Sequence, residues 1–201
     1  MQITAIKAQV KRAGRYSVFV DGTYSFSLSD TALLDSKLVP GQELTKEELG
    51  KLKQLSDDDK LLAKILNYTA LRPRSTWEVQ QYLQRNHSPA PLAQEILNKL
   101  SKLDLLNDEA FARSWVESRR LLKPTSRRKL ELELKQKRIA DEIIREVLAE
   151  DAPDERALLR ELIEKKTKQA KYQDRDKLMR YLAGQGFSYD DIKSVLSENQ
   201  E

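Results

Sequence analysis

A long internal repeat limits this chain to a tandem helical architecture. Leu83, Leu134 and Leu182 lie 51 and 48 residues apart and anchor three similar segments. A residue type that favours helix starts stands eight positions before each leucine, as Ser75, Ser126 and Asp174. Apolar residues follow five, ten and fourteen positions after the second and third leucines: Ile139 and Phe187, Ile144 and Ile192, Leu148 and Leu196. The pattern predicts repeats of amphipathic helices.

We expect three units, each with a longer helix, a short helix and a third helix. Their predicted bounds are residues 57–105, 108–150 and 154–198, and the first contains an insertion around residues 86–91. Stacked units touch mainly their neighbours, so the prediction is a mainly α protein with an elongated, curved array of helices. The composition agrees, because hydrophobic residues make up 39% of the chain, below the roughly 45–50% of compact proteins.

The first 28 residues are predicted to form strands, within an N-terminal module of residues 1–55 that also holds connecting helices. Two alternating segments flank Asp21-Gly22, which indicates a hairpin. A two-residue loop would pair Phe19 with Tyr24. We prefer a three-residue loop, which pairs Val18 with Tyr24 and Tyr16 with Phe26 and collects the apolar side chains on one face.

Helix starts are predicted where a hydroxyl residue precedes a carboxylate by three positions. We predict helix starts of this kind at Thr45/Glu48, Ser56/Asp59, Ser75/Glu78 and Ser188/Asp191. Asp108 is predicted to cap a further helix, and we assign Phe111 and Trp115 to the core.

The residue types argue against catalysis and against a cofactor. There is no cysteine, and His87 is the single histidine, so neither a two-histidine metal site nor a Ser-His relay is available. Gly184 and Gly186 follow a predicted helix rather than a strand, which does not suit a phosphate loop. With no signal peptide and no membrane-spanning segment in the sequence, we expect a monomeric cytoplasmic protein that is not an enzyme.

The positive charge is concentrated in one segment. The net charge is +4, but residues 119–138 contain nine basic and two acidic residues, so this segment carries +7 and the rest of the chain −3. Six of the cations fall within residues 119–129, more than we expect internal pairing to need, although Glu131/Lys135 and Glu133/Lys137 have helical pair spacing. No aromatic residues interleave with them, which favours contact with phosphates or an acidic protein surface over base recognition.

A second basic turn precedes Ser75. Pro73 forces Arg72 out of the helical region, so Arg72 and Arg74 flank the start of the next helix. The positive end of that helix would favour an anion beside the two arginines. A helix corner whose arginines bond to nearby protein groups explains the pattern equally well.

The same residues carry a family resemblance, which covers about residues 57–198. The matching positions run from Leu71-Arg72-Pro73-Arg74-Ser75 through Glu78 and Tyr82-Leu83, then Leu105 to Arg113 and Arg119, then Leu130, Glu133-Leu134, Lys137 and Ile139, and finally Leu182, Gly186 to Tyr189, Ile192 and Leu196. In this order and spacing the chain resembles the recombination regulator RecX, and residues 1–28 resemble the N-terminal extension of some members.

The resemblance implies a cytoplasmic bacterial protein that binds the RecA–DNA filament and inhibits its recombinase, ATPase and coprotease activities, and so acts in DNA repair and the SOS response. In that family the helical units lie in the filament groove, near the bound DNA. We therefore expect the following residues to contact RecA or DNA phosphates: Arg72, Arg74, Arg113, Arg119, Arg120, Arg127, Arg128, Lys129, Lys137 and Arg138. The +7 segment alone would also suit a nucleic-acid-binding protein with no obligate protein partner.

The chain departs from that family at two kinds of position. Members often carry glycine where this chain has Ser126 and Arg138. Two alternatives follow for the second position: Arg138 adopts a strained helix-end conformation, or that helix ends differently. Ala140 replaces the capping residue that Ser188 supplies in the third repeat, so the helix after Ala140 is predicted to fray at its start.

Overall fold

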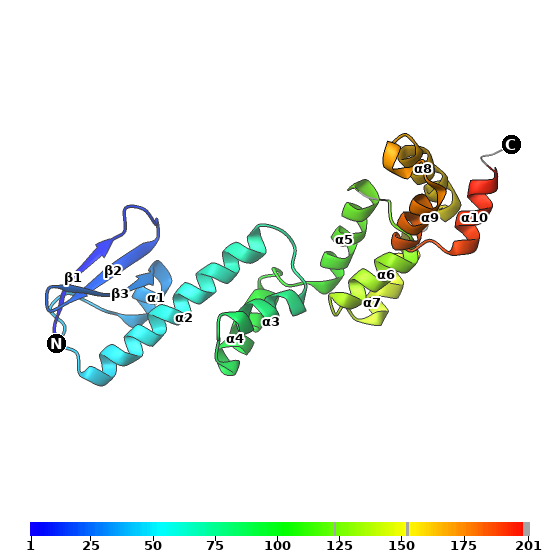
Figure 1. Ribbon diagram of the computed structural model, residues 1–201. Helices are drawn as coiled ribbons and strands as arrows, with labels where there is room; N and C mark the ends of the chain where they lie inside the picture. The colour runs from blue at the N-terminus through cyan, green and yellow to red at the C-terminus, as the bar shows by residue number, and fades with distance from the viewer. Residues whose placement is uncertain (123, 152, 199–201) are drawn as a thin grey trace. The chain divides into compact units, whose positions relative to one another are not determined.

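The computed structural model describes residues 1–122, 124–151 and 153–198, and these residues are mainly helical. Ten α-helices and one three-stranded sheet are formed by the described residues (Figure 1), which confirms the predicted mainly α class with a small N-terminal β-module. The chain divides into two compact units. The first is Met1–Arg72 with Tyr82–Asn98, and the second is Pro73–Gln81 with the chain from Lys99 onward.

The N-terminal sheet is antiparallel, with β1 (Ile3–Ala8), β2 (Arg15–Val20) and β3 (Thr23–Ser29) in that order. Asp21 and Gly22 form a two-residue loop, because Val20 pairs with Thr23. Both loop residues have positive φ, 48° and 82°, which matches the turn that suits the right-handed twist of a hairpin.

The preferred three-residue loop is therefore wrong. Phe19 pairs with Tyr24, as the two-residue alternative required, and an irregularity between Val18 and Phe19 then shifts the register. Beyond it Val18 pairs with Phe26 and Tyr16 with Leu28. A bulge of this kind inserts one residue into one strand, so the turn keeps its best geometry while Val18 and Phe26 stay buried in the core of the module.

Two helices complete the module: α1 (Asp30–Ser36) and α2 (Lys46–Ala70). Thr45 and Glu48 form the predicted capping box at the start of α2. The predicted start at Ser56 is wrong, because α2 continues through it and Ser56 is fully buried against β3. Its hydroxyl donates to the Ser27 carbonyl at 2.8 Å and accepts from the Ser27 amide at 3.4 Å.

The second hydrogen-bonding group that α2 offers to β3 is Asp59. Its carboxylate accepts from the Ser29 amide at 2.9 Å and from the Ser29 hydroxyl at 2.6 Å, and it pairs with Arg15 at 3.1 Å. Ser56 and Asp59 thus satisfy the outer edge of β3, a strand edge that would otherwise be open to pairing with another chain. The serine–carboxylate spacing that predicted a helix start serves a strand edge instead.

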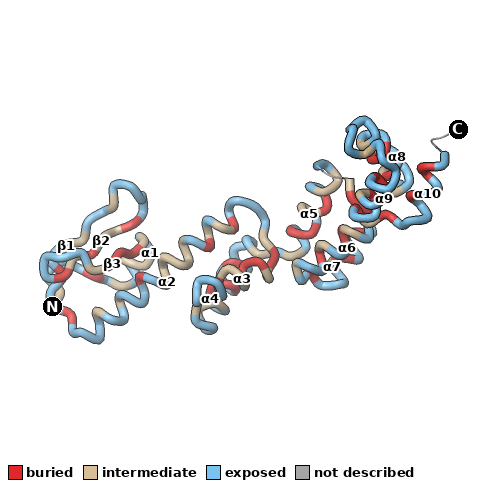
Figure 2. Tube along the Cα trace, in the orientation of Figure 1, coloured by how far each residue is buried: buried red, intermediate tan, exposed pale blue. Residues whose placement is uncertain are grey.

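Together with α2, the remaining helices follow one another in three sets of three. After α2 come α3 (Thr76–Arg85) and α4 (Ala90–Lys102); then α5 (Asp108–Leu122), α6 (Arg127–Gln136) and α7 (Asp141–Glu150); then α8 (Glu155–Thr167), α9 (Arg175–Gly184) and α10 (Tyr189–Glu198), with a short 3-10 turn at Ala170–Tyr172 before α9. Buried and exposed positions alternate along α5 to α10 (Figure 2), as amphipathic helices require.

Each set repeats the same helix end. The residue four positions after Leu83, Leu134 and Leu182 has a left-handed backbone: His87 at φ 54°, Arg138 at φ 58° and Gly186 at φ 91°. The next amide after His87 and after Arg138 bonds back to the carbonyl of the repeat leucine, at 3.1 and 3.2 Å. This geometry is a glycine-type helix stop, so the first of the two alternatives for Arg138, the strained conformation, is confirmed.

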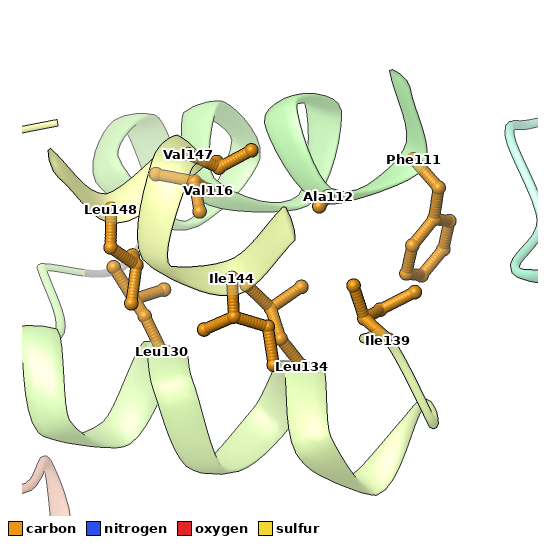
Figure 3. Close-up of a cluster of buried hydrophobic side chains, with 9 residues drawn as sticks. All are labelled: Phe111, Ala112, Val116, Leu130, Leu134, Ile139, Ile144, Val147 and Leu148. Atoms are coloured by element: carbon orange, nitrogen blue, oxygen red, sulfur yellow. The ribbon is translucent and has the colours of Figure 1, made fainter. Parts of the chain in front are cut away.

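The second and third sets each enclose their own hydrophobic core. Figure 3 shows the first of these cores, in which Leu130 and Leu134 of α6 point toward Ile144 and Leu148 of α7 and toward α5. Leu182, Phe187, Ile192 and Leu196 occupy the matching places in the third set. The apolar positions predicted from the repeat are therefore confirmed as buried.

Candidate partner-binding surface

The basic turn before α3 is built around its cap. The hydroxyl of Ser75 accepts from the Glu78 amide at 3.2 Å, and Ser75 is fully buried, so the predicted helix start at Ser75 is confirmed. Arg72 is exposed and Arg74 half-buried, and both interact with other groups of the chain. The two alternatives for this turn, an anion site and a bonded helix corner, both remain compatible with these positions.

The start of α5 differs from the prediction in a way that involves the same turn. Asn107, not Asp108, caps α5, since its side-chain oxygen accepts from the Ala110 amide at 3.0 Å. Asp108 instead accepts from the Thr76 amide at the start of α3, at 2.7 Å. The carboxylate of one helix thus satisfies the exposed amide of another, which fastens the first turn of α3 to α5.

Trp115 forms the centre of a cation cluster that the sequence did not reveal. Its ring is half-buried beside Phe111, and its indole N–H donates to the Glu133 carboxylate at 2.9 Å. The Arg119 guanidinium lies 4.7 Å from the ring centre and donates to the same carboxylate at 2.8 Å. Trp115 is thus both a core residue, as predicted, and a contact for basic side chains.

Lys137 approaches the same ring from α6's end. Its ammonium lies 5.2 Å from the ring centre of Trp115 and 2.7 Å from the carboxylate of Glu78. The side chain of Glu78 is only 8% exposed, so this pair is largely removed from water. The predicted helical pair Glu133/Lys137 is therefore wrong, because each of these residues bonds to a partner on another segment; the pair Glu131/Lys135 is confirmed at 2.8 Å.

Other predicted cations are also engaged inside the second unit. Arg120 pairs with Asp151 at 2.7 Å and donates to the Thr125 carbonyl. Arg113 pairs with Glu109 at 2.9 Å and with Glu150, and the second pair links α5 to α7. The hydrogen bond to Glu150 is the main cause of the raised pKa of the Arg113 guanidinium. Such bonds hold the helices together without an external partner.

Side chains in the first turn of α6 bond to α7 within the second set of helices and to α9 of the third set. Arg127 donates to the Leu148 carbonyl of α7, and Lys129 donates to the Gly184 carbonyl at the end of α9. The expectation that residues 119–129 hold more charge than internal bonding needs is thus too strong, because Arg119, Arg120, Arg127 and Lys129 all have internal partners. Lys123 of the same segment lies outside the described residues.

Arg128 and Arg138 differ from the other predicted contacts. Both are exposed, and neither makes an ion pair or side-chain hydrogen bond with any other residue that the structure describes. Both lie on or next to α6, the helix at the centre of the basic segment. Among the described residues of the basic segment, they are the two cations that a partner can engage without first breaking an internal bond.

The described residues offer neither a metal site nor a membrane-spanning helix. Among the described residues there is no cluster of three histidine, cysteine or acidic side chains that could hold a metal ion. No helix that these residues form combines the length and apolarity needed to cross a membrane.

Comparison with protein families identifies three segments of the chain. Residues 1–45 match the model described as "Regulatory protein RecX N-terminal domain". Residues 107–148 match "RecX, second three-helix domain" and residues 154–196 match "RecX, third three-helix domain". The last two segments coincide with α5 to α7 and with α8 to α10.

Individual proteins of the same description are similar along most of the chain. Regulatory protein RecX of Listeria monocytogenes serotype 4a is 31% identical over 203 residues, which cover 98% of this chain and 76% of the relative. Regulatory protein RecX of Lactobacillus gasseri is 34% identical over 153 residues. That match covers 76% of this chain but only 56% of the relative, so the chain spans little more than half of the Lactobacillus protein.

Solved structures share the fold. A crystal structure of regulatory protein RecX matches with a TM-score of 0.68 at 24% identity and covers 98% of both chains. The crystal structure of RecX from Lactobacillus salivarius matches with a TM-score of 0.56 at 28% identity, over 71% of this chain and 96% of the other.

Proposed function

The chain belongs to the RecX family of regulatory proteins, and on that premise we propose that it binds the RecA–DNA filament and inhibits its recombinase, ATPase and coprotease activities. The observation that carries this proposal is the match of the N-terminal, second and third domains of the family to consecutive parts of the chain. The protein acts by occupying a surface of the filament, in the cytoplasm, and performs no catalysis of its own.

The contacts of the basic residues suggest which of them bind the partner and which hold the helices in place. Arg128 and Arg138 face solvent and supply charge for acidic side chains or phosphates of the filament. Arg113, Arg119, Arg120, Arg127, Lys129 and Lys137 hold α3, α5, α6, α7 and α9 in place and so shape the surface that carries the first two. Arg72 and Arg74 add a second basic turn before α3.

The direct test is to add the protein to RecA on single-stranded DNA with ATP and to measure ATP hydrolysis and strand exchange. Both rates should fall as the protein approaches the concentration of filament binding sites. Unchanged rates at several-fold excess would show that the chain does not regulate RecA in this way.

A pair of charge-reversal variants separates a specific surface from bulk charge. Arg128→Glu combined with Arg138→Glu should weaken inhibition about tenfold or more, since two cations face acidic or phosphate groups. Arg145→Glu on α7 is the control at another exposed site, because the Arg145 side chain is 74% exposed and its described bonds, to Glu142 and to the Asp141 carbonyl, stay within its own helix. Equal loss of inhibition in both proteins would mean that no particular cation is used.

The alternative function is direct nucleic-acid binding without an obligate protein partner, and the +7 charge of residues 119–138 favours it. Binding to naked DNA should then weaken steeply as salt rises, in proportion to the phosphates contacted. Filament binding should tolerate moderate salt better and require RecA with nucleotide. A salt series with naked DNA and with filament therefore distinguishes the two functions.

A further inference from the structure

An exposed leucine in α6, within the basic segment of residues 119–138, has no explanation in the packing of the described residues. Leu132 lies between the buried residues Leu130 and Leu134, yet 56% of its surface is exposed. Arg128 and Lys135 stand four positions before it and three positions after it, so the three side chains share one face of α6. A single exposed leucine is common on protein surfaces, so its meaning depends on whether it lines a concave surface together with other apolar side chains.

This face of α6 forms one wall of a groove of about 690 Å³. The other wall is the corner between α9 and α10, where Tyr189 is 57% exposed. The lining also includes Lys129 and Glu131, so it holds three cations and one carboxylate, and Glu131 pairs with Lys135 at 2.8 Å. The groove therefore combines two exposed apolar surfaces with excess positive charge.

Close packing at the base holds the two walls in a fixed relation. Gly186 approaches α6 so closely that an added Cβ would collide with the Ser126 hydroxyl and lie 2.7 Å from the Lys129 Cβ. The Ser126 amide also donates to the Gln185 carbonyl at 3.1 Å, and Gln185 is almost fully buried. A ligand thus meets a preformed groove and loses little free energy to ordering it.

We infer that the groove between α6 and the α9–α10 corner, defined by Arg128, Leu132, Lys135 and Tyr189, docks an acidic segment of a partner protein that carries a large apolar side chain. The inference rests on the proposed function, since it names the kind of partner segment that the basic surface takes. The apolar side chain lies between Leu132 and Tyr189, and flanking carboxylates pair with Arg128 and with Lys135, whose ammonium stays solvent-accessible beside Glu131.

The spacing along α6 sets the pattern of that segment. Arg128 and Lys135 are seven residues apart, about 10 Å along a helix with a rise of roughly 1.5 Å per residue. An extended peptide advances about 3.3 Å per residue, so its two acidic residues stand about three positions apart with the apolar residue between them.

Two features of the lining favour such a segment over single-stranded nucleic acid. Leu132 occupies the middle of the α6 wall and offers no hydrogen-bonding group to a base. Tyr189 is the one exposed ring of the described lining, and the Lys193 ammonium lies 4.8 Å from its centre, so one face of the ring is already in contact with a cation. Stacking of successive bases needs several free rings.

The first test needs no recombinase. The full chain, labelled with ¹⁵N, is titrated with the synthetic peptide Gly-Asp-Glu-Leu-Phe-Glu-Asp-Gly, with a peptide in which serine replaces leucine and phenylalanine, and with a dT15 oligonucleotide. We expect the first peptide to shift the amides around Leu132 and Tyr189 and the serine peptide to bind about tenfold more weakly, because a buried large apolar side chain contributes about that factor. Equal binding of the two peptides, or stronger shifts of the same amides by dT15, would overturn the inference.

Substitution of the groove links it to the filament. Leu132→Ser should weaken both peptide and filament binding about tenfold, while Leu103→Ser, which replaces a leucine of similar exposure (54%) outside the groove, should leave both unchanged. If wild-type protein binds filament and Leu132→Ser binds it equally well, the groove is not the docking site but the proposed function stands. If wild-type protein does not bind filament at all, the proposed function fails, and the peptide titration still decides the chemistry of the groove.

Discussion

At the scale of single residues, Arg138 shows how a backbone angle can conflict with a side chain. Three homologous helix ends in the chain adopt the left-handed conformation, and only Gly186 does so without a steric penalty. Arg138 keeps this turn because the following residue, Ile139, returns to the core and is buried. The conformation belongs to the repeat, whichever residue occupies it.

Replacement of Arg138 by glycine should therefore stabilise the protein. We expect the free energy of unfolding to rise by about 0.5–1 kcal/mol, since glycine relieves the left-handed strain and the exposed arginine loses no ion pair with a described residue. Urea denaturation followed by circular dichroism measures the change. Gly186→Ala is the opposite control and should destabilise, because its Cβ would strike Ser126 and Lys129. A destabilised Arg138→Gly protein would contradict the strain argument.

At the scale of elements, Ser56 shows that a helix residue can stabilise a strand: it lies within α2, but its hydroxyl bonds to the backbone of β3. Both hydrogen bonds of its hydroxyl go to Ser27 on the edge of β3. Helix propensity alone predicts that alanine at this position stabilises α2 by about 0.5 kcal/mol. Loss of the bonds removes the Ser56 partner of the buried Ser27 amide, at a cost of about 1–3 kcal/mol, while the Ser27 carbonyl keeps its bond from Arg15.

Ser56→Ala should thus lower the free energy of unfolding, against the propensity, and equilibrium denaturation gives the sign directly. Ser118→Ala on α5 is the matched control, because Ser118 is exposed within a helix and its hydroxyl makes no hydrogen bond with a described residue. That control should be neutral or slightly stabilising. Similar behaviour of the two variants would mean that the contact with β3 contributes nothing.

The ion pair between Glu78 and Lys137 joins the first turn of α3 to the end of α6. Lys137→Met should destabilise the protein by about 1–3 kcal/mol, because it removes a cationic partner at 2.7 Å from a carboxylate whose side chain is only 8% exposed. Arg128→Ala should change stability by less than about 0.5 kcal/mol, as expected for an exposed side chain without a described partner. Thermal or urea denaturation compares the two.

This comparison also decides how a loss of filament inhibition is interpreted. If Lys137→Met weakens inhibition and also loosens the structure, Lys137 acts by positioning the surface rather than by contact. If it weakens inhibition at full stability, Lys137 contacts the partner directly, contrary to the division of roles proposed above.

At the scale of the whole molecule, surface carboxylates in both units link stability to pH. Hydrogen bonds from Arg113 and Arg160 lower the pKa of Glu150 and Glu198 below the ordinary value of 4.5. The backbone amide of Thr45 does the same for Glu48. Because these pKa values are lower in the folded chain than in the unfolded chain, the unfolded chain takes up protons first as the pH falls.

The stabilisation from these groups should therefore be complete above about pH 4.5 and should decline as the pH falls below that value. Melting temperatures between pH 7 and pH 3 test this. Glu198→Gln already lacks the contribution at pH 7 and should show a smaller decline, whereas Glu161→Gln, which removes a carboxylate that pairs with no described residue, should follow the wild type. A decline that is identical in all three proteins would exclude Glu198 as a cause.

The basic surface could be predicted only in part. The run of cations from Arg119 to Arg138 is evident in the sequence, but its pattern does not tell which members are internally bonded. Lys137 and its partner Glu78 are 59 residues apart, and Trp115 meets Glu133 only because α5 packs on α6. The sequence did not predict Leu132 and Tyr189 as part of a binding surface, because exposed apolar residues carry no periodic signal of their own.

The buried face of each helix in the repeats could be predicted from the sequence alone. Leucines and isoleucines at helical spacing define that face within their own helix, whichever segment packs against it. Leu134, Ile144, Leu182 and Ile192 were assigned correctly for this reason. The hairpin register, the role of Ser56 and the availability of each arginine depended on folding, because hydrogen bonds and ion pairs form between groups that approach each other only when separate segments pack together.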